Sequence, residues 1–270
     1  MGAKINHIAI VAENYAQVAQ FYQFIFGFRA PPEQKVFNAV TIGDGYVGLN
    51  LNPRRPARNA GLDHFGIEVE DVEHTMDRLK QRYPEVHVLK RLGNRKFAGY
   101  TTHDPDGNIL DLSQRQLANR GEIYTENELG WQQKRTVSHY GVRTLHPERM
   151  AEFYADMFGL TPANKQPGDP NQYMSDGRVT LTLMPWDILD FDNTGIVRAG
   201  PHHIGIKVES LESFKADLDH AVAENPSLAP TPLAVGREGE ALRKNFAESV
   251  PYAAMQLADN THVLLAVNAA

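Results

Sequence analysis

Residues 7–28 of the chain read HIAIVAENYAQVAQFYQFIFGF, an apolar segment followed by a segment whose apolar residues recur three and four positions apart. The first pattern is typical of a buried β-strand, and the second is typical of an amphipathic α-helix with one buried face. Asn14 is suited to cap the start of a helix over 14–26, and Gly27 is suited to end it. The stretch therefore predicts a strand that opens on His7 and leads directly into a helix.

The same pattern returns 132 positions later, where residues 139–160 read HYGVRTLHPERMAEFYADMFGL. Further on, residues 63–69 (DHFGIEV) match residues 202–208 (HHIGIKV) at an offset of 139, so the second copy has gained seven residues. Solenoid repeats have periods of about 20 to 50 residues, whereas a repeat of this length indicates duplicated domains.

Each copy also has an internal repeat, because a strand that opens on histidine and a following helix occur at its start and again near its middle. The second helix of the first copy is expected over 72–82, after Asp71, and its counterpart begins after Ser210. Short strands separated by turns follow each helix. Four βαβββ modules therefore predict an α+β fold in which each domain has a curled mixed sheet around a cavity, with helices outside. The expected domains are 1–118 and 136–270, joined by a linker over 119–135.

The composition excludes several classes of function. The formal net charge is −6, from 33 acidic and 27 basic residues, which argues against nucleic acid and anionic membranes as partners. No apolar run approaches the roughly 18 residues needed to cross a bilayer, and the first residues lead directly into a strand, so a cytoplasmic protein is expected. Cysteine is absent, which leaves nitrogen and oxygen donors for any metal.

Three residues form a candidate metal site in the first copy: His7, His64 and Asp111. Each lies in a predicted strand whose other face carries apolar residues suited to packing. Since side chains alternate between the two faces of a strand, the three donors are expected on the inner face of the curled sheet. Two imidazoles and one carboxylate from three strands are typical of a divalent metal site that leaves positions open for substrate.

The second copy provides an internal control for this site. It keeps both histidines, as His139 and His203, but the alignment of the last strand places Leu265 where the carboxylate would be. Asp259 and His262 lie nearby, though neither falls on that strand position. The second pocket is therefore predicted to be a degenerate site without a metal.

Four motifs resemble those of the vicinal oxygen chelate superfamily, which includes glyoxalase I, bleomycin- and fosfomycin-resistance proteins, methylmalonyl-CoA epimerase and type I extradiol dioxygenases. They are HIAIV at 7–11, FYQFIFGF at 21–28, DHFGI at 63–67 and DPDGNILD at 104–111. Four modules in one chain resemble the two-domain extradiol dioxygenases. That resemblance implies an Fe(II) site, with Mn(II) as the alternative metal, an aromatic diol as substrate and O₂ as co-substrate. The oligomeric state stays open, with a homo-oligomer among the options.

The sequence departs from the dioxygenase pattern at several positions. The complete ligand set lies in the first domain rather than the second, and its carboxylate is Asp111 rather than a glutamate. Asn50 lies in the region where that family has an acid–base histidine, and the family's tyrosine ahead of the last strand is matched only approximately by Tyr100. The predicted catalytic residues are His103, whose imidazole titrates near neutrality, and Tyr100. The residues predicted to contact substrate are Asn50, Glu68 and Arg95.

Two other functions stay open at this point. One is a metal-dependent lyase, isomerase or epimerase that acts through an enolate without O₂. The other is a non-enzymatic protein that binds a small molecule, as in the resistance proteins of the superfamily. A glyoxalase-type site needs a fourth ligand on the strand at 46–51, which carries no acid. Membership in a fold family alone does not decide among these chemistries.

Overall fold

The computed structural model describes residues 2–30, 39–91, 99–114, 133–187, 198–232, 236–250 and 253–270. The elements of the first copy are β1 (Lys4–Ala12), α1 (Tyr15–Phe26), β2 (Val40–Gly43), β3 (Gly48–Pro53), β4 (Gly61–Val69), α2 (Val72–Arg82), β5 (Leu89–Lys90), β6 (Tyr100–His103) and β7 (Ile109–Gln114). Those of the second copy are β8 (Thr136–Thr144), α3 (Pro147–Phe158), β9 (Thr161–Pro162), β10 (Gln172–Ser175), β11 (Thr180–Pro185), β12 (Gly200–Val208), α4 (Leu211–Glu224), the short 3₁₀ helix η2 (Pro226–Leu228), α5 (Gly236–Ser249), β13 (Met255–Ala258) and β14 (Leu264–Ala269).

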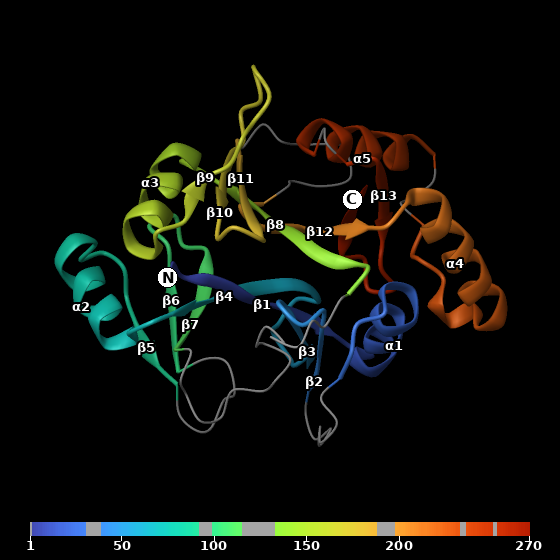
Figure 1. Cartoon of the computed structure of the whole chain (residues 1–270), viewed down its shortest axis with the longest axis horizontal. Helices are drawn as coiled ribbons and strands as arrows, with labels where there is room; N and C mark the ends of the chain where they lie inside the picture. The colour runs from blue at the N-terminus through green and yellow to red at the C-terminus, as the bar shows by residue number, and fades with distance from the viewer. Residues whose placement is uncertain are drawn as a thin grey trace.

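Two seven-stranded mixed sheets dominate the fold, and each takes all its strands from one copy of the repeat (Figure 1). The first sheet has the order β2-β3-β1-β4-β7-β6-β5, and the second has the order β13-β14-β12-β8-β11-β10-β9. Within the part of the chain that the structure describes, neither sheet closes into a barrel. The predicted α+β architecture with two curled mixed sheets is confirmed. Among the described residues, the first and fourth modules have two strands and one isolated bridge in place of three strands, with the bridges at Arg29–Gly43 and Thr231–Ala258, and the fourth module also has the additional helix α5.

The first two helices begin and end where the sequence predicts. The side chain of Asn14 accepts a hydrogen bond from the backbone N–H of Gln17, and Gly27 ends α1 in the left-handed conformation with a φ of 72°. At the start of α2, the side chain of Asp71 accepts from the backbone N–H of His74. These contacts satisfy backbone groups that a helix end otherwise leaves without partners.

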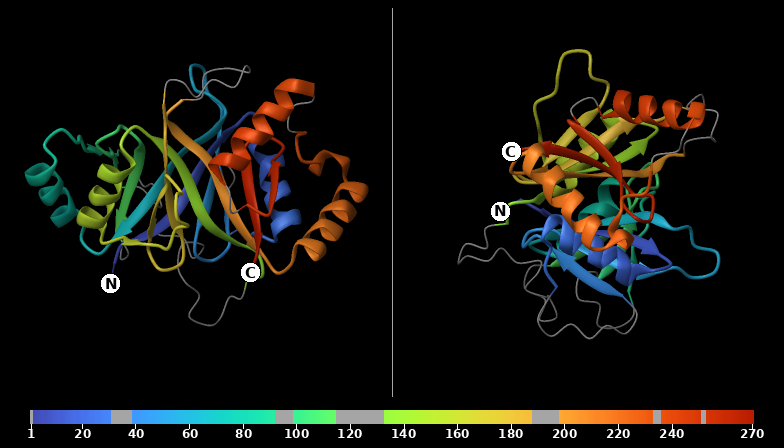
Figure 2. Two further views of the ribbon diagram at one scale, coloured as in Figure 1. Left: turned by 90° about the horizontal axis from the view of Figure 1, so that it is seen from above. Right: turned by 90° about the vertical axis from the view of Figure 1, so that its right-hand side faces the viewer.

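The two copies pack against each other through the apolar faces of their sheets and through helix pairs. The ring of Phe65 in β4 lies 5.2 Å from that of Tyr140 in β8, between centroids. On one side α1 lies beside α4, where Phe26 stacks on Phe214 at 5.4 Å, and on the other side α2 lies beside α3 (Figures 1 and 2). Because neighbouring residues in a strand face opposite ways, His64 and His139 point away from this interface. We call the faces that carry them the outer faces of the two sheets, because they point away from the contact between the copies. On the first sheet, this is the face predicted above as the inner side of the curl.

Reciprocal hydrogen bonds relate the two copies by an approximate two-fold axis. Tyr22 of the first copy donates to the carboxylate of Asp259 in the second, and Tyr154 of the second copy donates to Asp104 in the first, each at 2.9 Å. All four residues are buried. Each copy therefore supplies the partner for a buried carboxylate of the other.

A second reciprocal exchange involves two aspartates in corresponding turns, Asp44 and Asp176. The carboxylate of Asp44 accepts from the backbone N–H of Val137, and that of Asp176 accepts from the backbone N–H of Ile5, each at 2.8 Å. Two identical contacts in opposite directions are the mark of a self-complementary interface.

The predicted linker over 119–135 lies outside the described residues up to residue 132, so its boundaries stay a prediction. Its last residue, Arg135, is buried, and its guanidinium donates to the Glu209 carboxylate at 2.8 Å and to the Ile25 carbonyl oxygen at 2.6 Å.

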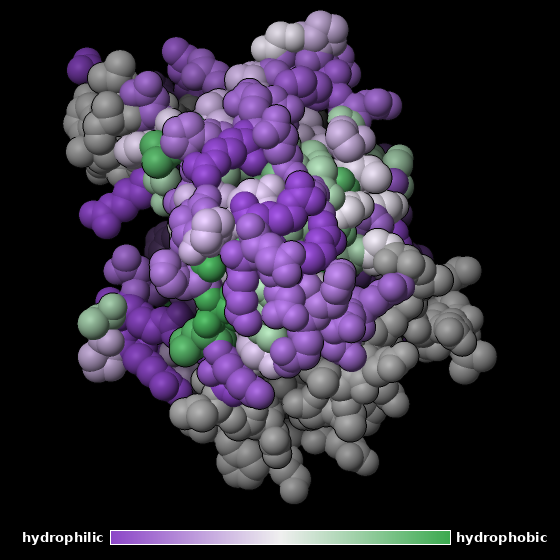
Figure 3. Space-filling model, turned by 90° about the vertical axis from the view of Figure 1, so that its left-hand side faces the viewer, coloured by the Kyte–Doolittle hydropathy of each residue, from purple (hydrophilic) through white to green (hydrophobic). Residues whose placement is uncertain are grey.

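The face of the molecule that carries α2 and α3 is mainly hydrophilic among its coloured atoms (Figure 3). Within the described residues, no helix is both long and apolar enough to span a membrane.

Candidate metal centre

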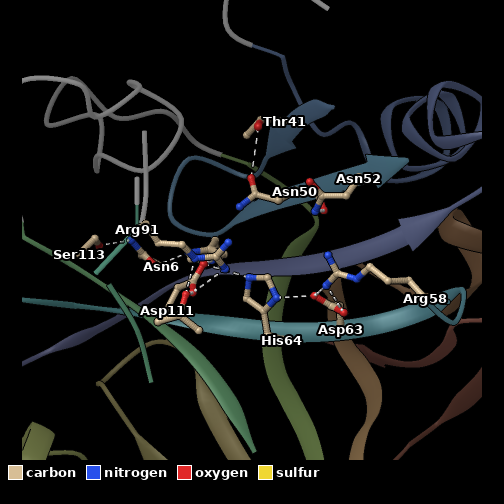
Figure 4. A network of polar contacts seen from close by, with 12 residues as sticks. Asn6, Thr41, Asn50, Asn52, Arg58, Asp63, His64, Arg91, Asp111 and Ser113 are labelled. Atoms are coloured by element: carbon tan, nitrogen blue, oxygen red, sulfur yellow. Dashed lines mark hydrogen bonds and ion pairs between the residues drawn. The ribbon is translucent and has the colours of Figure 1, made fainter. Parts of the chain in front are cut away.

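The three predicted ligands come from three adjacent strands of the first sheet: His7 from β1, His64 from β4 and Asp111 from β7. All three are buried, and they form the one group of metal-ligating side chains found among the described residues. One donor atom of each lies within 4.8 Å of the others. Figure 4 shows the carboxylate of Asp111 and the ring of His64 turned toward each other above the sheet.

Gly66 occupies the strand position between two of the ligands. It pairs with His7 on one side and with Asp111 on the other. A Cβ atom at this position would lie only 1.9 Å from Cε1 of His7, so the imidazole lies directly over the glycine. A glycine here is what allows the ring to cross the middle strand toward the carboxylate.

The distances among the donors suit a divalent ion. Nε2 of His64 lies 3.2 Å and Nε2 of His7 lies 3.9 Å from Oδ2 of Asp111. Ligand bonds of about 2.0–2.2 Å around one ion place donors about 3 Å apart, so small side-chain adjustments would bring all three to a common ion. Two imidazoles and one carboxylate on one side of an ion are typical of non-haem Fe(II) sites with open positions. The residues present therefore fit such an ion.

Polar contacts behind His64 orient its ring. Nδ1 of His64 donates to the carboxylate of Asp63 at 2.7 Å. Arg58 in turn donates to both oxygens of Asp63, at 2.7 and 2.6 Å. Such an arrangement fixes the tautomer and leaves Nε2 free of its proton when a metal is bound. Asp63 and Arg58 have no part in the predicted site, although the acid directly before His64 is visible in the sequence.

His7 is held in the same way from the other side. Its Nδ1 lies 2.8 Å from Oδ1 of Asn6, and the amide nitrogen of Asn6 donates to the hydroxyl of Ser113 at 2.9 Å. Because the amide oxygen is an acceptor, Nδ1 of His7 carries the proton and Nε2 faces the site.

The second oxygen of Asp111 contacts Thr101 and Arg91. The hydroxyl of Thr101 donates to Oδ1 of Asp111, and the guanidinium of Arg91 lies 3.3 Å from the same oxygen. Arg91 also donates to the hydroxyl of Thr101. Thr101 lies directly opposite Asp111 in the β6–β7 pair. These two donors keep Oδ1 turned away from the histidines, so Oδ2 is the oxygen presented to a metal.

In the metal-free protein, a proton lies where a metal would bind. Burial opposes a charge on His64, but hydrogen bonds to Asp111 and Asp63 outweigh it and raise the pKa of His64 to about 9. Burial lowers the pKa of His7 to about 3, against the attraction of Asp111. Burial alone would raise the pKa of Asp111, yet the hydrogen bond from His64 and its charge hold that pKa well below the usual range. Of the two histidine rings, only that of His64 is therefore charged near neutrality, and it faces the ionised carboxylate of Asp111.

The structure does not bring Tyr100 or His103 into contact with the three ligands. The hydroxyl of Tyr100 donates to Glu73 of α2 at 2.6 Å, on the opposite face of the sheet from Thr101. Nε2 of His103 accepts from the backbone N–H of His87 at 3.0 Å, and Nδ1 lies 2.7 Å from the carbonyl oxygen of Asp104. Tyr100 points away from the ligands because side chains alternate between the two faces of a strand, and His103 is held by the backbone of the adjacent turn.

The three residues predicted to contact substrate have different positions. Asn50 is buried in β3, which β1 separates from the strands of His64 and Asp111. Its side-chain oxygen accepts from Thr41 at 3.2 Å (Figure 4). Glu68 is buried in β4, two positions after Gly66 and thus on the outer face. Arg95 lies outside the described residues.

The second copy lacks the carboxylate, but at a different residue from the one predicted. Gly205 is the counterpart of Gly66, and it pairs with Ala266, as Gly66 pairs with Asp111. Leu265 instead pairs with Ile204 and corresponds to Leu110. The prediction of Leu265 was wrong by one residue, because the insertion around α5 hid the offset.

Other features of the second copy agree with the corrected alignment. The turns before the last strands correspond, since Gly107 and His262 both have positive φ, 91° and 67°. Nε2 of His139 lies 3.1 Å from Nε2 of His203, so the two imidazoles form a hydrogen bond with each other. Asp259 is occupied by Tyr22 and does not replace the missing acid.

Comparisons with known proteins agree with this architecture. Residues 4–112 match the sequence profile of the Glyoxalase/Bleomycin resistance protein/Dioxygenase superfamily. No curated protein sequence matches the chain. Homoprotocatechuate 2,3-dioxygenase from Arthrobacter globiformis has a TM-score of 0.64 and 14% identity, over 100% of this chain and 80% of that one. The 2,3-dioxygenase LapB from Pseudomonas sp. KL28 has a TM-score of 0.63 and 14% identity, over 100% of this chain and 93% of that one.

A fusion of a xylose isomerase-like TIM barrel with 4-hydroxyphenylpyruvate dioxygenase has a TM-score of 0.57 and 16% identity. The match covers 82% of this chain but only 38% of the fusion protein. At identities this low, the likeness to these structures shows the fold alone.

Proposed function

We propose that the chain is an extradiol-type dioxygenase, which is supported by the match of residues 4–112 to the Glyoxalase/Bleomycin resistance protein/Dioxygenase superfamily. It would use Fe(II), or Mn(II) as the alternative metal, to cleave the ring of a catechol-like diol with O₂. The observation that carries this proposal is the set of His7, His64 and Asp111, whose donor atoms lie within 4.8 Å of one another. A bound ion of this kind supplies Lewis acidity and open positions for two reactants.

The charges around the site favour a doubly anionic ligand. As ligands, His7 and His64 are neutral, and the single negative charge of Asp111 is offset by the guanidinium of Arg91 at 3.3 Å. These four side chains therefore leave both positive charges of a divalent ion uncompensated. A diol that loses both protons on binding matches that charge, whereas a singly charged enolate matches it less well.

The buried side chains on the outer face would position the substrate and take up its proton. Glu68 shares that face with His64, and its carboxylate is the proton acceptor we propose. Asn50 offers an amide across β1, already oriented by Thr41. Arg91 and Thr101 hold Asp111, so that its other oxygen faces the position of the ion.

Oxygen uptake tests the proposal. The chain is loaded anaerobically with Fe(II) to one ion per chain, and a panel of catechols is added with O₂. We expect one O₂ consumed per diol and none after His64→Ala. The dioxygenase proposal is contradicted if fully loaded protein takes up no oxygen with any diol.

Deuterium exchange, metal analysis and ligand affinity distinguish the two alternatives. A lyase, isomerase or epimerase would exchange substrate protons with solvent deuterium without consuming O₂. A non-enzymatic binding protein would hold no stoichiometric metal and would keep its affinity for a small molecule after His64→Ala.

A further inference from the structure

The second copy has a pocket on its outer face that no step of the proposed reaction uses. Its volume is about 370 Å³, within the range of about 300–1,000 Å³ that small-molecule sites occupy. The pocket lies between β8, β11, β12, β14 and the loop from β9 to β10. Its lining includes His139, Thr182, Lys207, Lys165, Tyr173 and Asp169.

This pocket is not built for a metal. His139 is hydrogen-bonded to His203, and Ala266 stands at the position of the carboxylate ligand. The ring of Phe246, from α5, lies 5.7 Å from the ring of His203 and packs against Ala266. Burial lowers the pKa of His139 to about 4, so this side chain forms a neutral floor near physiological pH.

Register comparison shows that the charge of the pocket is inverted relative to the first copy. Lys207 pairs with Asn268, as Glu68 pairs with Ser113, so a lysine stands where the first copy has a buried acid. Together with the change from Asp111 to alanine, two negative charges have been lost and one positive charge gained.

The surrounding loop adds a second lysine and holds its own acid internally. Lys165 lies on the rim and donates to the carbonyl oxygen of Asn171 at 3.2 Å. The carboxylate of Asp169 accepts from the hydroxyl of Tyr173 at 2.6 Å and from the backbone N–H of Asn171 at 2.9 Å. The loop therefore contributes a cation at the rim, while its acid is directed into hydrogen bonds that shape the loop.

We propose that this pocket is a separate, metal-independent binding site for a small molecule that carries a carboxylate or phosphate group. The anionic group lies within reach of Lys165 and Lys207, and the body of the molecule rests against Tyr173, Thr182 and the floor formed by His139. The proposal goes beyond the dioxygenase function and does not depend on it, because the two sites lie on opposite outer faces.

Calorimetric titration of the full chain, freed of metal by a chelator, tests the proposal. The probes are inorganic phosphate, 4-hydroxybenzoate and the neutral phenol. We expect one site per chain for at least one of the two anions, with phenol weaker than 4-hydroxybenzoate by about tenfold or more. Binding of phosphate alone identifies a phosphate compound as the ligand class, and binding of 4-hydroxybenzoate alone identifies a carboxylate.

Substitutions locate the binding. Lys207→Gln and Lys165→Gln, both at exposed positions, should each weaken the anion by about tenfold, which is the loss of one charged contact. Lys215→Gln, an exposed lysine on α4, is the matched control and should leave the affinity unchanged. The proposal is overturned if neither anion binds below about 10 mM, or if both lysine variants bind like the unaltered chain. It is also overturned if His64→Ala abolishes the binding while Lys207→Gln does not.

Discussion

Both copies of the repeat place two histidines at equivalent strand positions, yet the two histidine pairs differ in what lies between the rings. In the first copy, His7 and His64 face a carboxylate, and their ring centroids are 5.7 Å apart. In the second, His139 and His203 contact each other directly, and their centroids are 5.0 Å apart. The acid thus decides whether the same backbone presents three donors to an ion or a closed imidazole pair.

The residues behind the histidines also differ between the two copies. Asp63 orients His64, whereas its counterpart His202 places a neutral imidazole 2.8 Å from Nδ1 of His203. The glycines beneath the rings persist in both copies, and a Cβ at Gly66 or Gly205 would lie 1.9 Å from the neighbouring imidazole. The glycine positions are therefore the same in the two copies, whereas the side chains that would select a cation differ.

Asp111→Ala should convert the first site into a copy of the second and has the largest expected effect. Loss of the one anionic ligand should lower the affinity for Mn(II) by more than about a hundredfold, because second-sphere changes alone cost 10–100-fold. Titration calorimetry measures the affinity, and circular dichroism confirms the fold. Unchanged affinity would mean that the three residues do not hold the metal.

Gly66→Ala tests the frame itself. The added methyl would overlap the ring of His7, so we expect both a loss of metal affinity and a destabilisation of about 1–3 kcal/mol in urea unfolding. Gly205→Ala is the matched control, since it meets the same clash in the second copy. It should destabilise the chain to a similar extent and leave the metal affinity unchanged.

Asp63→Asn tests the orienting contact of His64. Removing the charge behind the ring should weaken metal binding by about 10–100-fold, as for other residues that orient a ligand. His202→Asn changes the equivalent residue of the second copy and should have no effect on the metal. Equal effects of the two variants would contradict the assignment of a single metal site.

The pH dependence of metal binding gives the smallest effect per step. The protonated ring of His64 stabilises the metal-free protein fully below its unfolded pKa of 6.5, and this stabilisation is lost as the pH rises through about 9. A metal must displace that proton, so its apparent affinity should rise by up to about tenfold per pH unit between these values. Titrations with Mn(II) at pH 7 and 8 measure the slope. A flat profile would contradict a protonated His64 in the metal-free protein.

Periodic and local features of the fold could be predicted from the sequence. The apolar spacing and caps of α1 and α2 are encoded within a few residues, and the shared face of the three candidate ligands follows from strand alternation. The insertion around α5 could not be aligned from the repeat, and the one-residue error at Leu265 followed from it. Thr101, rather than Tyr100, contacts Asp111 because the register of β6 against β7 sets the pairing, and a shift of one residue exchanges the faces.

The crossed tyrosine–aspartate contacts have a consequence for a half-length chain. Residues 1–118 alone would expose the apolar face around Phe65 and would leave the Asp104 carboxylate without its tyrosine. A second copy of the same fragment would supply Tyr22 in place of Tyr154, because the contact already runs in both directions. The fragment should therefore sediment as a symmetric homodimer, and a monomer would show that the copies are no longer interchangeable. The chain would then correspond to such a homodimer joined into one polypeptide, with the complete candidate metal site in only one of its described halves.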